Sequence, residues 1–323
     1  MKQVKLVAHA IKVCYYNINT QNIRAHAKFT GNGEGFMANV KEQKLFAAKI
    51  RLETVKQVGV RGFGHLGGAL SVVDAIAVLY SGVMYIDPAN PDKTDRDKLV
   101  MSKGHAGPAL YSALALKGYF PMAWLKTLNQ PGTKLPSHCD CKLTPGIDMT
   151  TGSLGQGAST ACGLALAQKM DEIDAYTYLF VGDGESNEGQ VWEAALFANQ
   201  HKLDNLIAFV DCNQKQLDGT TEEVMAMGDI AAKFETFGWH TQSIQGDDVV
   251  AIEKAIKKAK EVKGKPSCIV LNTIKGAGVP EIEKIEFNHH IVLDGALLEK
   301  AVAACEATVK ELEGGAVSHG DCI

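Results

Sequence analysis

Two polar side chains follow two apolar runs of the sequence, each at the point where the run ends. The run 176–181 leads to Asp183, and the run 206–210 leads to Asn213. Small apolar residues at helical spacing over 191–198 lie between them, so the pattern predicts a strand, helix, strand unit. Ligands of open parallel sheets bind at the carboxyl ends of the strands. Oxygen donors there, beside glycines that let backbone N–H groups approach, suit Mg²⁺ or Ca²⁺ holding a diphosphate.

The spacing of these two residues resembles a known cofactor motif. Gly-Asp-Gly at 182–184, followed by the 28 residues 185–212 and then Asn213, is similar to the motif of enzymes that use thiamine diphosphate (ThDP). The Glu188-Gly189 pair and the Leu-Asp-Gly sequence at 217–219 resemble the transketolase branch of these enzymes. A Gly-Asp-Gly triplet alone is usually a turn, whereas the whole composite is specific.

The resemblance implies a role for each matching residue. The cation would join the diphosphate to Asp183, Asn213 and the backbone carbonyl of Lys215. Glu188 would face a glutamate of a partner chain across an interface. The implied cofactor contacts are His105, Gly152, Leu154, Asp183, Gly184, Glu188, Asn213 and His289.

A glycine-rich loop at 152–157 precedes a helix of small residues. It resembles the transketolase loop that lies against the aminopyrimidine ring of the cofactor, which implies contacts from Gly152 and Leu154. The family usually has proline where Ser153 stands here, and this difference leaves a backbone role possible.

Four histidines lie in segments that resemble those of transketolases. Histidine can exchange protons with substrate hydroxyls near neutral pH. The resemblance implies that the catalytic set is His65, His105, His138 and His289. The family commonly has glycine after the last of these, and His290 stands there, so the spacing favours His289 but leaves the choice between the two open.

The predicted elements place these residues on one sheet. The glycines between 59 and 68 predict a loop, and Ser71 is the expected N-cap of a helix reaching about Met84. The pattern predicts an α/β fold with a doubly wound, mostly parallel sheet and helices on both faces. The predicted strands are 98–102, 176–181, 206–210, 238–244 and 267–273. The predicted helices are 41–58, 107–116, 158–170, 191–198, 231–237, 250–259 and 297–312.

Composition excludes several function classes. The chain has 323 residues, of which 46% are hydrophobic and 22% are charged, as in ordinary globular proteins. A net charge of −4 argues against nucleic-acid binding, and no apolar run approaches the roughly 20 residues that a membrane helix needs. Eight cysteines without a Cys-x-x-Cys pair favour reduced thiols and a cytoplasmic location.

The resemblance covers about residues 41–310, and we expect one ThDP-binding domain over 37–312. Residues 1–36 are basic and have no acidic residue before Glu34. A transit peptide has this composition, but we favour a flexible leader or an over-extended start. Residues 313–323 are expected to form a mobile tail.

The reaction that the resemblance implies is transfer of a two-carbon ketol group from a ketose phosphate to an aldose phosphate. Full-length transketolases continue into a pyrimidine-binding domain, which carries the proton-transfer glutamate, and into a third domain. The chain therefore resembles the N-terminal subunit of a split transketolase. We expect it to work only with a separate C-terminal subunit, as an α₂β₂ assembly.

Three alternatives stay open. The first is the α subunit of another ThDP enzyme, such as a 2-oxoacid dehydrogenase E1, although the histidines favour transketolase. The second is a split transketolase for an unusual sugar, either a sulfosugar or a branched pentulose phosphate. The third is a non-catalytic regulatory paralogue, against which the intact Asp183 and Asn213 argue.

Overall fold

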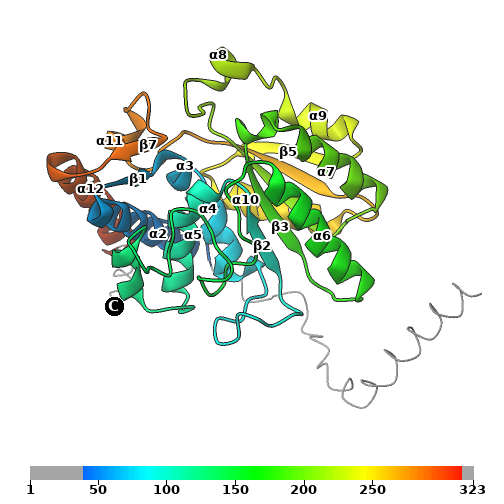
Figure 1. The fold of residues 1–323 in the computed structure, drawn as a ribbon, viewed down its shortest axis with the longest axis horizontal. Helices are drawn as coiled ribbons and strands as arrows, with labels where there is room; N and C mark the ends of the chain where they lie inside the picture. Colours follow the sequence, from blue (N-terminus) through cyan, green and yellow to red (C-terminus); the bar gives the residue numbers. More distant parts are fainter. Residues whose placement is uncertain (1–38, 315–323) are drawn as a thin grey trace, which may run out of the picture. The chain divides into compact units, whose positions relative to one another are not determined.

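A five-stranded parallel sheet forms the centre of residues 39–314, the part of the chain that the computed structural model describes (Figure 1). The predicted α/β fold class is confirmed. In spatial order the strands are β2 (Lys98–Met101), β3 (Thr177–Gly182), β4 (Leu206–Cys212), β6 (Ser267–Asn272) and β5 (His240–Gln245).

The three central strands are buried on both faces, which explains their nearly continuous apolar sequences. Successive side chains enter different cores because strand side chains alternate between faces. Phe180 stacks on Phe209 in one core, with 4.8 Å between the ring centroids, while Val181 and Val210 pack in the other. This alternation holds β3 and β4 in the register that places their carboxyl ends together.

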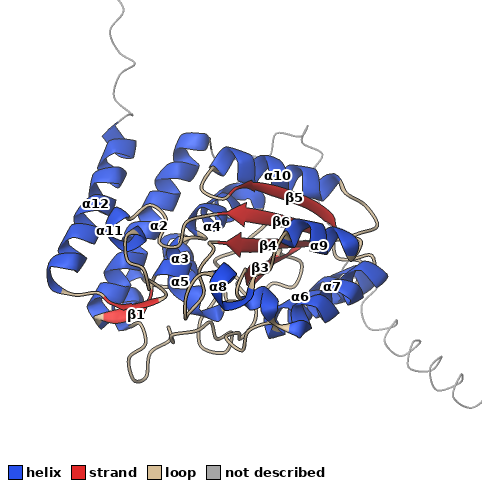
Figure 2. Cartoon of the chain, turned by 90° about the horizontal axis from the view of Figure 1, so that it is seen from above, coloured by secondary structure: helices blue, strands red, loops and turns tan. Residues whose placement is uncertain are grey.

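Helices cover both faces of the sheet, as predicted for a doubly wound fold (Figure 2). One face carries α6 (Gln156–Met170), α7 (Gly189–Gln200) and α9 (Ile230–Thr236). The other carries α4 (Val73–Val78) and α10 (Val249–Glu261). On that side α2 (Val40–Arg61) packs against α4, α5 (Gly107–Leu116) and α12 (Gly295–Gly314).

The first predicted helix is correct and has defined ends. The Asn39 side chain accepts from the Glu42 N–H, and the Glu42 carboxylate accepts from the Asn39 N–H, which forms a capping box. At the other end Gly62 adopts a left-handed φ of 86°, so the chain turns sharply. This turn leads directly into the strand that carries His65.

The predicted glycine loop between 59 and 68 is wrong. Phe63–His65 form strand β1, which pairs antiparallel with β7 (His290–Val292), and Gly67–Leu70 form α3. The partner strand lies more than two hundred residues away in sequence, so local pattern could not reveal the pairing. The pairing places His65 directly opposite His290.

Ser71 is not the helix N-cap that the sequence predicted. The cap position of α4 is Val72, which has no capping side chain, and Ser71 Oγ donates instead to the Asp211 carboxylate at 2.6 Å. The helix is also shorter than predicted, because a π-helical turn at Leu79–Val83 follows it. The buried carboxylate outcompetes the local cap.

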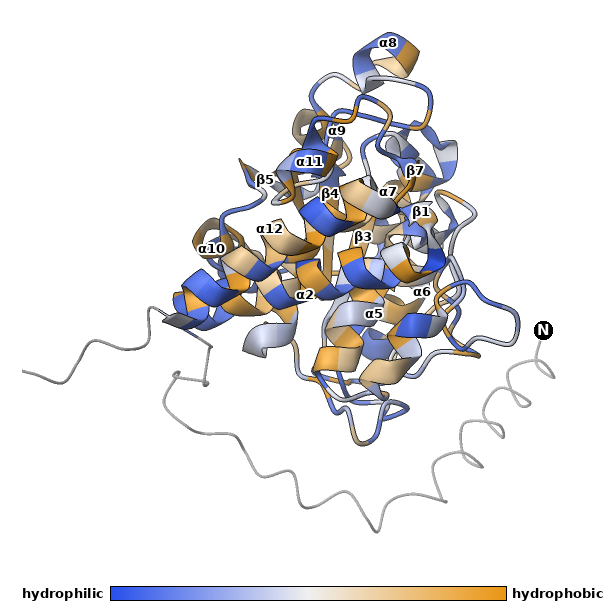
Figure 3. Ribbon diagram, turned by 90° about the vertical axis from the view of Figure 1, so that its left-hand side faces the viewer, coloured by the Kyte–Doolittle hydropathy of each residue, from blue (hydrophilic) through white to orange (hydrophobic). Residues whose placement is uncertain are grey.

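Several short elements were not predicted, namely α8 (Thr221–Met225), α11 (Pro280–Glu283) and β7. Helix α8 stands away from the sheet in Figures 1 and 3, and none of its residues is buried. Elsewhere the predicted boundaries shift by about two residues: α6 begins at Gln156, β5 begins at His240 and α12 spans 295–314.

Two predictions concern the ends of the chain. The expected leader 1–36 and all but two residues of the expected tail 313–323 lie outside the described residues. Among residues 39–314, no helix is both long and apolar enough to cross a membrane.

Candidate active site

A cavity of about 380 Å³ lies at the carboxyl edge of the sheet. The elements that reach it are far apart in sequence: β1, the ends of β2, β3, β4 and β6, and two long loops. Every candidate site residue from the sequence lines this cavity: His65, His105, His138, Gly152, Leu154, Asp183, Gly184, Glu188, Asn213, Lys215 and His289. The structure thus brings the whole set together, while the role of each residue remains a prediction.

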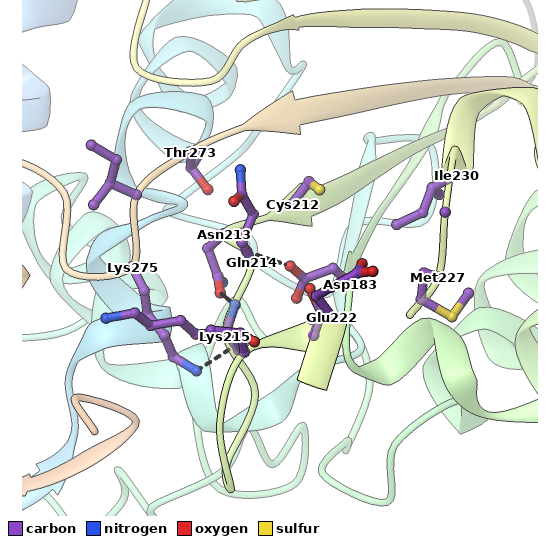
Figure 4. A pocket seen from close by; sticks show the side chains of 14 residues that line it. Asp183, Cys212, Asn213, Gln214, Lys215, Glu222, Met227, Ile230, Thr273 and Lys275 are labelled. Atoms are coloured by element: carbon purple, nitrogen blue, oxygen red, sulfur yellow. Dashed lines mark hydrogen bonds between the residues drawn. The ribbon is translucent and has the colours of Figure 1, made fainter. Parts of the chain in front are cut away.

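Asp183 follows β3 and faces the loop that follows β4. One carboxylate oxygen accepts from the Gly184 N–H at 2.8 Å and the other from the Gln214 N–H at 2.6 Å (Figure 4). Burial, together with the nearby Asp211 charge, raises the Asp183 pKa to about 6. A cation placed beside this carboxylate would stabilise its ionised form.

Asn213 is oriented by its amide nitrogen. Nδ2 donates to the Asp211 carboxylate at 2.7 Å, while Oδ1 accepts from the Lys215 N–H at 3.2 Å. Because the nitrogen is held by a buried carboxylate, the oxygen is the atom left available to the cavity. Asp183 and Asn213 therefore both present oxygen at the same sheet edge.

Asp211 organises this edge, and sequence reasoning did not single it out. It is fully buried in β4 and accepts four hydrogen bonds, which come from Ser71, Lys103, Asn213 and Thr273. Burial alone would raise the Asp211 pKa, but the ion pair with Lys103 and these hydrogen bonds lower it. A charged residue inside an otherwise apolar strand was the available signal, since such residues are rarely buried without a partner.

Glu185 connects the glycine-rich loop to the end of β3. Its buried carboxylate accepts from Ser102 Oγ, from the Gly155 N–H at 2.8 Å and from the Gly182 N–H at 3.0 Å. Burial raises the pKa of Glu185. This residue also was not predicted, and it fixes the loop that carries Gly152 and Leu154.

Two glycines lie where a side chain would not fit. A Cβ at Gly184 would lie 2.8 Å from Cβ of Gln216. Gly152 has φ of +131°, and a Cβ there would lie 2.8 Å from Cδ2 of His138. These positions keep the backbone open beside the cavity, as a bound diphosphate and ring would require.

The histidine cluster consists of His65, His105, His138, His289 and His290. His65 lies at its centre, with its ring centroid 4.8 to 5.4 Å from those of the other four. The rings of His105 and His289 are 4.7 Å apart. His289 lines the cavity, whereas His290 is exposed on β7 and does not line it, so the structure favours His289 as the spacing did.

Burial makes most of this cluster neutral at pH 7. It lowers the pKa of His65 to about 4 and that of His289 to about 3, with neighbouring positive groups adding to the effect. The pKa values of His105 and His138 are lowered for the same reason. Neutral imidazoles each offer one donor and one acceptor, which suits proton exchange with hydroxyl groups.

A second cavity of about 570 Å³ lies beneath α8 and shares Asp183, Asn213 and Lys215 with the first. Met227 and Ile230 form its apolar side, across from the polar residues (Figure 4). The oxygen donors therefore lie on a wall between two hollows, and they can be approached from both.

The residues present fit a divalent cation and a diphosphate. Asp183, Asn213 and the Lys215 carbonyl supply oxygen donors of the type that Mg²⁺ and Ca²⁺ prefer. Gly184 leaves its backbone open, and the histidines can donate to phosphate oxygens.

Comparison with known proteins identifies the family. Residues 42–308 match the family described as transketolase, thiamine diphosphate binding domain. This chain belongs to the transketolase family. The predicted resemblance, a transferase of the transketolase type with a ThDP-binding domain, is thereby confirmed.

Among relatives of this transketolase-family chain, the 6-deoxy-6-sulfo-D-fructose transketolase subunit SqwG of Clostridium sp. strain MSTE9 is 53% identical over 257 residues. These cover 80% of this chain and 94% of that protein. A subunit of the apulose-4-phosphate transketolase of Phocaeicola vulgatus is 38% identical, over 85% of this chain and 97% of that protein.

The crystal structure of the Campylobacter jejuni transketolase superposes with a TM-score of 0.78 at 31% identity. The match covers 85% of this chain but 46% of that transketolase. The chain thus spans almost the whole of two proteins named as subunits and less than half of this solved transketolase.

Proposed function

We propose that this chain is the ThDP-binding subunit of a two-chain transketolase that transfers a two-carbon ketol group from a ketose to an aldose. One observation carries the proposal: neutral histidines and a pair of oxygen donors line a single cavity in a transketolase-family chain. Bound ThDP would supply the carbanion and the electron sink that ketol transfer needs.

Mg²⁺ or Ca²⁺ would bind Asp183, Asn213 and the Lys215 carbonyl and neutralise the diphosphate. The open backbone at Gly184 and the positions of His105 and His289 support direct phosphate contacts. Gly152 and Leu154 would lie against the aminopyrimidine ring, and their place in the same cavity wall supports this assignment.

The catalytic work of the protein would fall to His65, His105, His138 and His289. Each is held with a lowered pKa beside the others, so each can accept a proton from a substrate hydroxyl and return it. His138 and Gly152 are close neighbours, which would place substrate and aminopyrimidine side by side.

A separate C-terminal subunit would supply the pyrimidine-binding domain and its glutamate, in an α₂β₂ assembly. The names of the two subunits described above support a partner chain. Glu188 lines the cavity and would face the partner's glutamate. The six cysteines within the described residues are free thiols, which supports a cytoplasmic location.

For the substrate, we propose an anionic sugar of the unusual kind, with 6-deoxy-6-sulfofructose as the leading candidate donor. The 53% identity to SqwG, against 38% to the apulose-4-phosphate transketolase chain, supports this order. Ketol transfer from that donor would leave a four-carbon sulfoaldose and lengthen the acceptor by two carbons.

The test is to purify the chain with the candidate partner encoded in the neighbouring reading frame and to assay it with ThDP and Mg²⁺. We expect transfer to glyceraldehyde 3-phosphate, fastest from 6-deoxy-6-sulfofructose and slower from fructose 6-phosphate or apulose 4-phosphate. Transfer by the single chain would contradict the two-chain proposal. Decarboxylation of a 2-oxoacid instead would favour the E1 alternative.

A non-catalytic regulatory paralogue is tested by calorimetry. With the partner subunit present, we expect ThDP to bind only when Mg²⁺ or Ca²⁺ is added. If no cation-dependent ThDP binding occurs, the regulatory alternative is favoured and the enzymatic proposal fails.

A further inference from the structure

Lys275 is a buried lysine in the wall of the cavity that we assign to the diphosphate. Its side chain lies among site residues, yet only 3% of the residue's surface is exposed. It lines both cavities at the sheet edge, where it follows β6. A lysine is rarely buried unless it is paired, so its partners are informative.

The backbone around Lys275 is held in place. Its carbonyl accepts from Asn288 Nδ2 at 2.8 Å, and the next N–H, of Gly276, donates to the Gly67 carbonyl at 3.0 Å. Gly276 has a left-handed φ of 94°, which turns the chain away directly after the lysine. These contacts anchor the residue to both the β1–β7 side and the sheet.

The ammonium group of Lys275 has no carboxylate partner among the described residues. Nζ donates to the Lys215 carbonyl at 2.9 Å and contacts Nδ1 of His289 at 3.0 Å. The other two lysines of the cavity differ. Lys103 is paired with Asp211, and Nζ of Lys215 contacts the carbonyls of Ile285 and Glu286. Lys275 therefore supplies the unneutralised positive charge of this cavity wall.

The contact with His289 determines which of its ring nitrogens carries the proton. An ammonium has three N–H donors and no acceptor, so Nδ1 must accept from Lys275. In a neutral imidazole the proton then resides on Nε2. His289 would thus be a hydrogen-bond donor through Nε2.

We propose that Lys275 is a cofactor-binding residue of this chain. It supplies a fixed positive charge to the diphosphate and holds His289 as the Nε2–H tautomer, which can donate to a phosphate oxygen. This inference rests on the proposed function, since it assumes that the cavity binds ThDP. In the bound state the Lys215 carbonyl is shared between this ammonium and the divalent cation.

The first test replaces Lys275 with methionine, which keeps the length and removes the charge. ThDP binding is measured by calorimetry at fixed Mg²⁺ with the proposed partner subunit present. We expect Lys275→Met to weaken binding by about 10- to 100-fold, because a hydrogen bond to a charged group is lost. Inorganic pyrophosphate as the probe should show the same loss, since the charge acts on the diphosphate.

Two further variants serve as controls. Lys275→Arg keeps the charge and should retain most of the affinity, while Lys284→Met removes an exposed lysine nearby and should leave it unchanged. Equal affinity of the wild type and Lys275→Met would overturn the role of Lys275 alone. Failure of the wild type to bind ThDP would overturn both this inference and the proposed function.

The second test does not depend on a variant that folds. Nitrogen-15 NMR of the wild-type chain distinguishes the two histidine tautomers, and we expect His289 to carry its proton on Nε2. In Lys275→Met this preference should weaken, because the donor to Nδ1 is gone. A wild-type His289 with its proton on Nδ1 would overturn the proposal.

Discussion

Two groups of ionisable side chains meet at the carboxyl edge of this sheet, and they are built in opposite ways. The Asp211 cluster, which comprises Asp211 with Ser71, Lys103, Asn213 and Thr273, pairs its charges and fills the hydrogen-bonding positions of its carboxylate. The histidine cluster instead keeps its rings neutral beside a cavity. One group is closed and the other is open.

The difference separates support from chemistry. A buried carboxylate with four donors cannot exchange protons easily, but it fixes the ends of β2, β4 and β6 relative to the turn at Ser71. Histidines with lowered pKa values gain no such partners and remain free to bind substrate. The predictions below test whether stability depends on the first cluster and activity on the second.

The largest effect is expected for Asp211→Ala. This change leaves the Lys103 ammonium buried without a partner, which costs on the order of 3–5 kcal/mol in the free energy of unfolding. Urea denaturation of the chain measures the loss. A variant in which Lys103→Met accompanies Asp211→Leu should recover part of it, because no unpaired charge is left buried.

Asp204→Ala provides the matched control on the same strand side. Asp204 pairs with Lys169 at 2.8 Å at a partly exposed position, so its loss should cost no more than about 1 kcal/mol. If the two aspartate variants were equally stable, the Asp211 cluster would not be the support that we infer.

The sequence predicted most of the candidate site because short motifs mark the ends of strands. Asp183, Asn213 and the four histidines each follow a strand or lie in a glycine-rich segment, and the parallel sheet gathers them. The supporting residues could not be predicted in this way. Lys103 and Asp211 lie 108 residues apart, and only the fold shows that they are paired.

The errors have the same origin. Ser71 looked like a local helix cap, but its hydroxyl bonds to a carboxylate 140 residues away. The glycines near His65 looked like a loop, but Phe63–His65 find a partner strand at His290–Val292. Local propensity is a weak guide wherever a buried long-range contact competes with it.

For the open cluster, His65→Gln should lower kcat of ketol transfer by about 10²–10⁴-fold, as removal of a proton-exchanging group does. His65 contacts all four other histidines, so the change removes the centre of the cluster. The assay uses the chain with its proposed partner. Stability should change little, and a large loss of stability with normal kcat would reverse the comparison.

A change between the two clusters is Asp183→Ala. We expect cation-dependent ThDP binding to weaken by at least about 10- to 100-fold while the chain remains folded, because a metal ligand is lost. Calorimetry with and without Mg²⁺ measures this, and thermal unfolding checks the fold. Unchanged affinity would show that the cation binds elsewhere.

The smallest effect is a pH dependence of stability that the histidine cluster creates. The pKa values of His65 and His289 are lowered in the folded chain to about 4 and about 3, whereas an unfolded histidine titrates near 6.5. Between those values the unfolded chain binds more protons, so stability falls as the pH is lowered below about 6.5. We expect the wild-type melting temperature, measured without cofactor, to fall between pH 7 and pH 5.

His65→Gln should make that decline shallower, because one of the protons taken up on unfolding is removed. His201→Gln is the matched control, since His201 is an exposed histidine at the end of α7 and its loss should leave the slope unchanged. An equal slope in the wild type and in His65→Gln would mean that the open cluster does not oppose protonation, and the contrast with the Asp211 cluster would then lose its electrostatic basis.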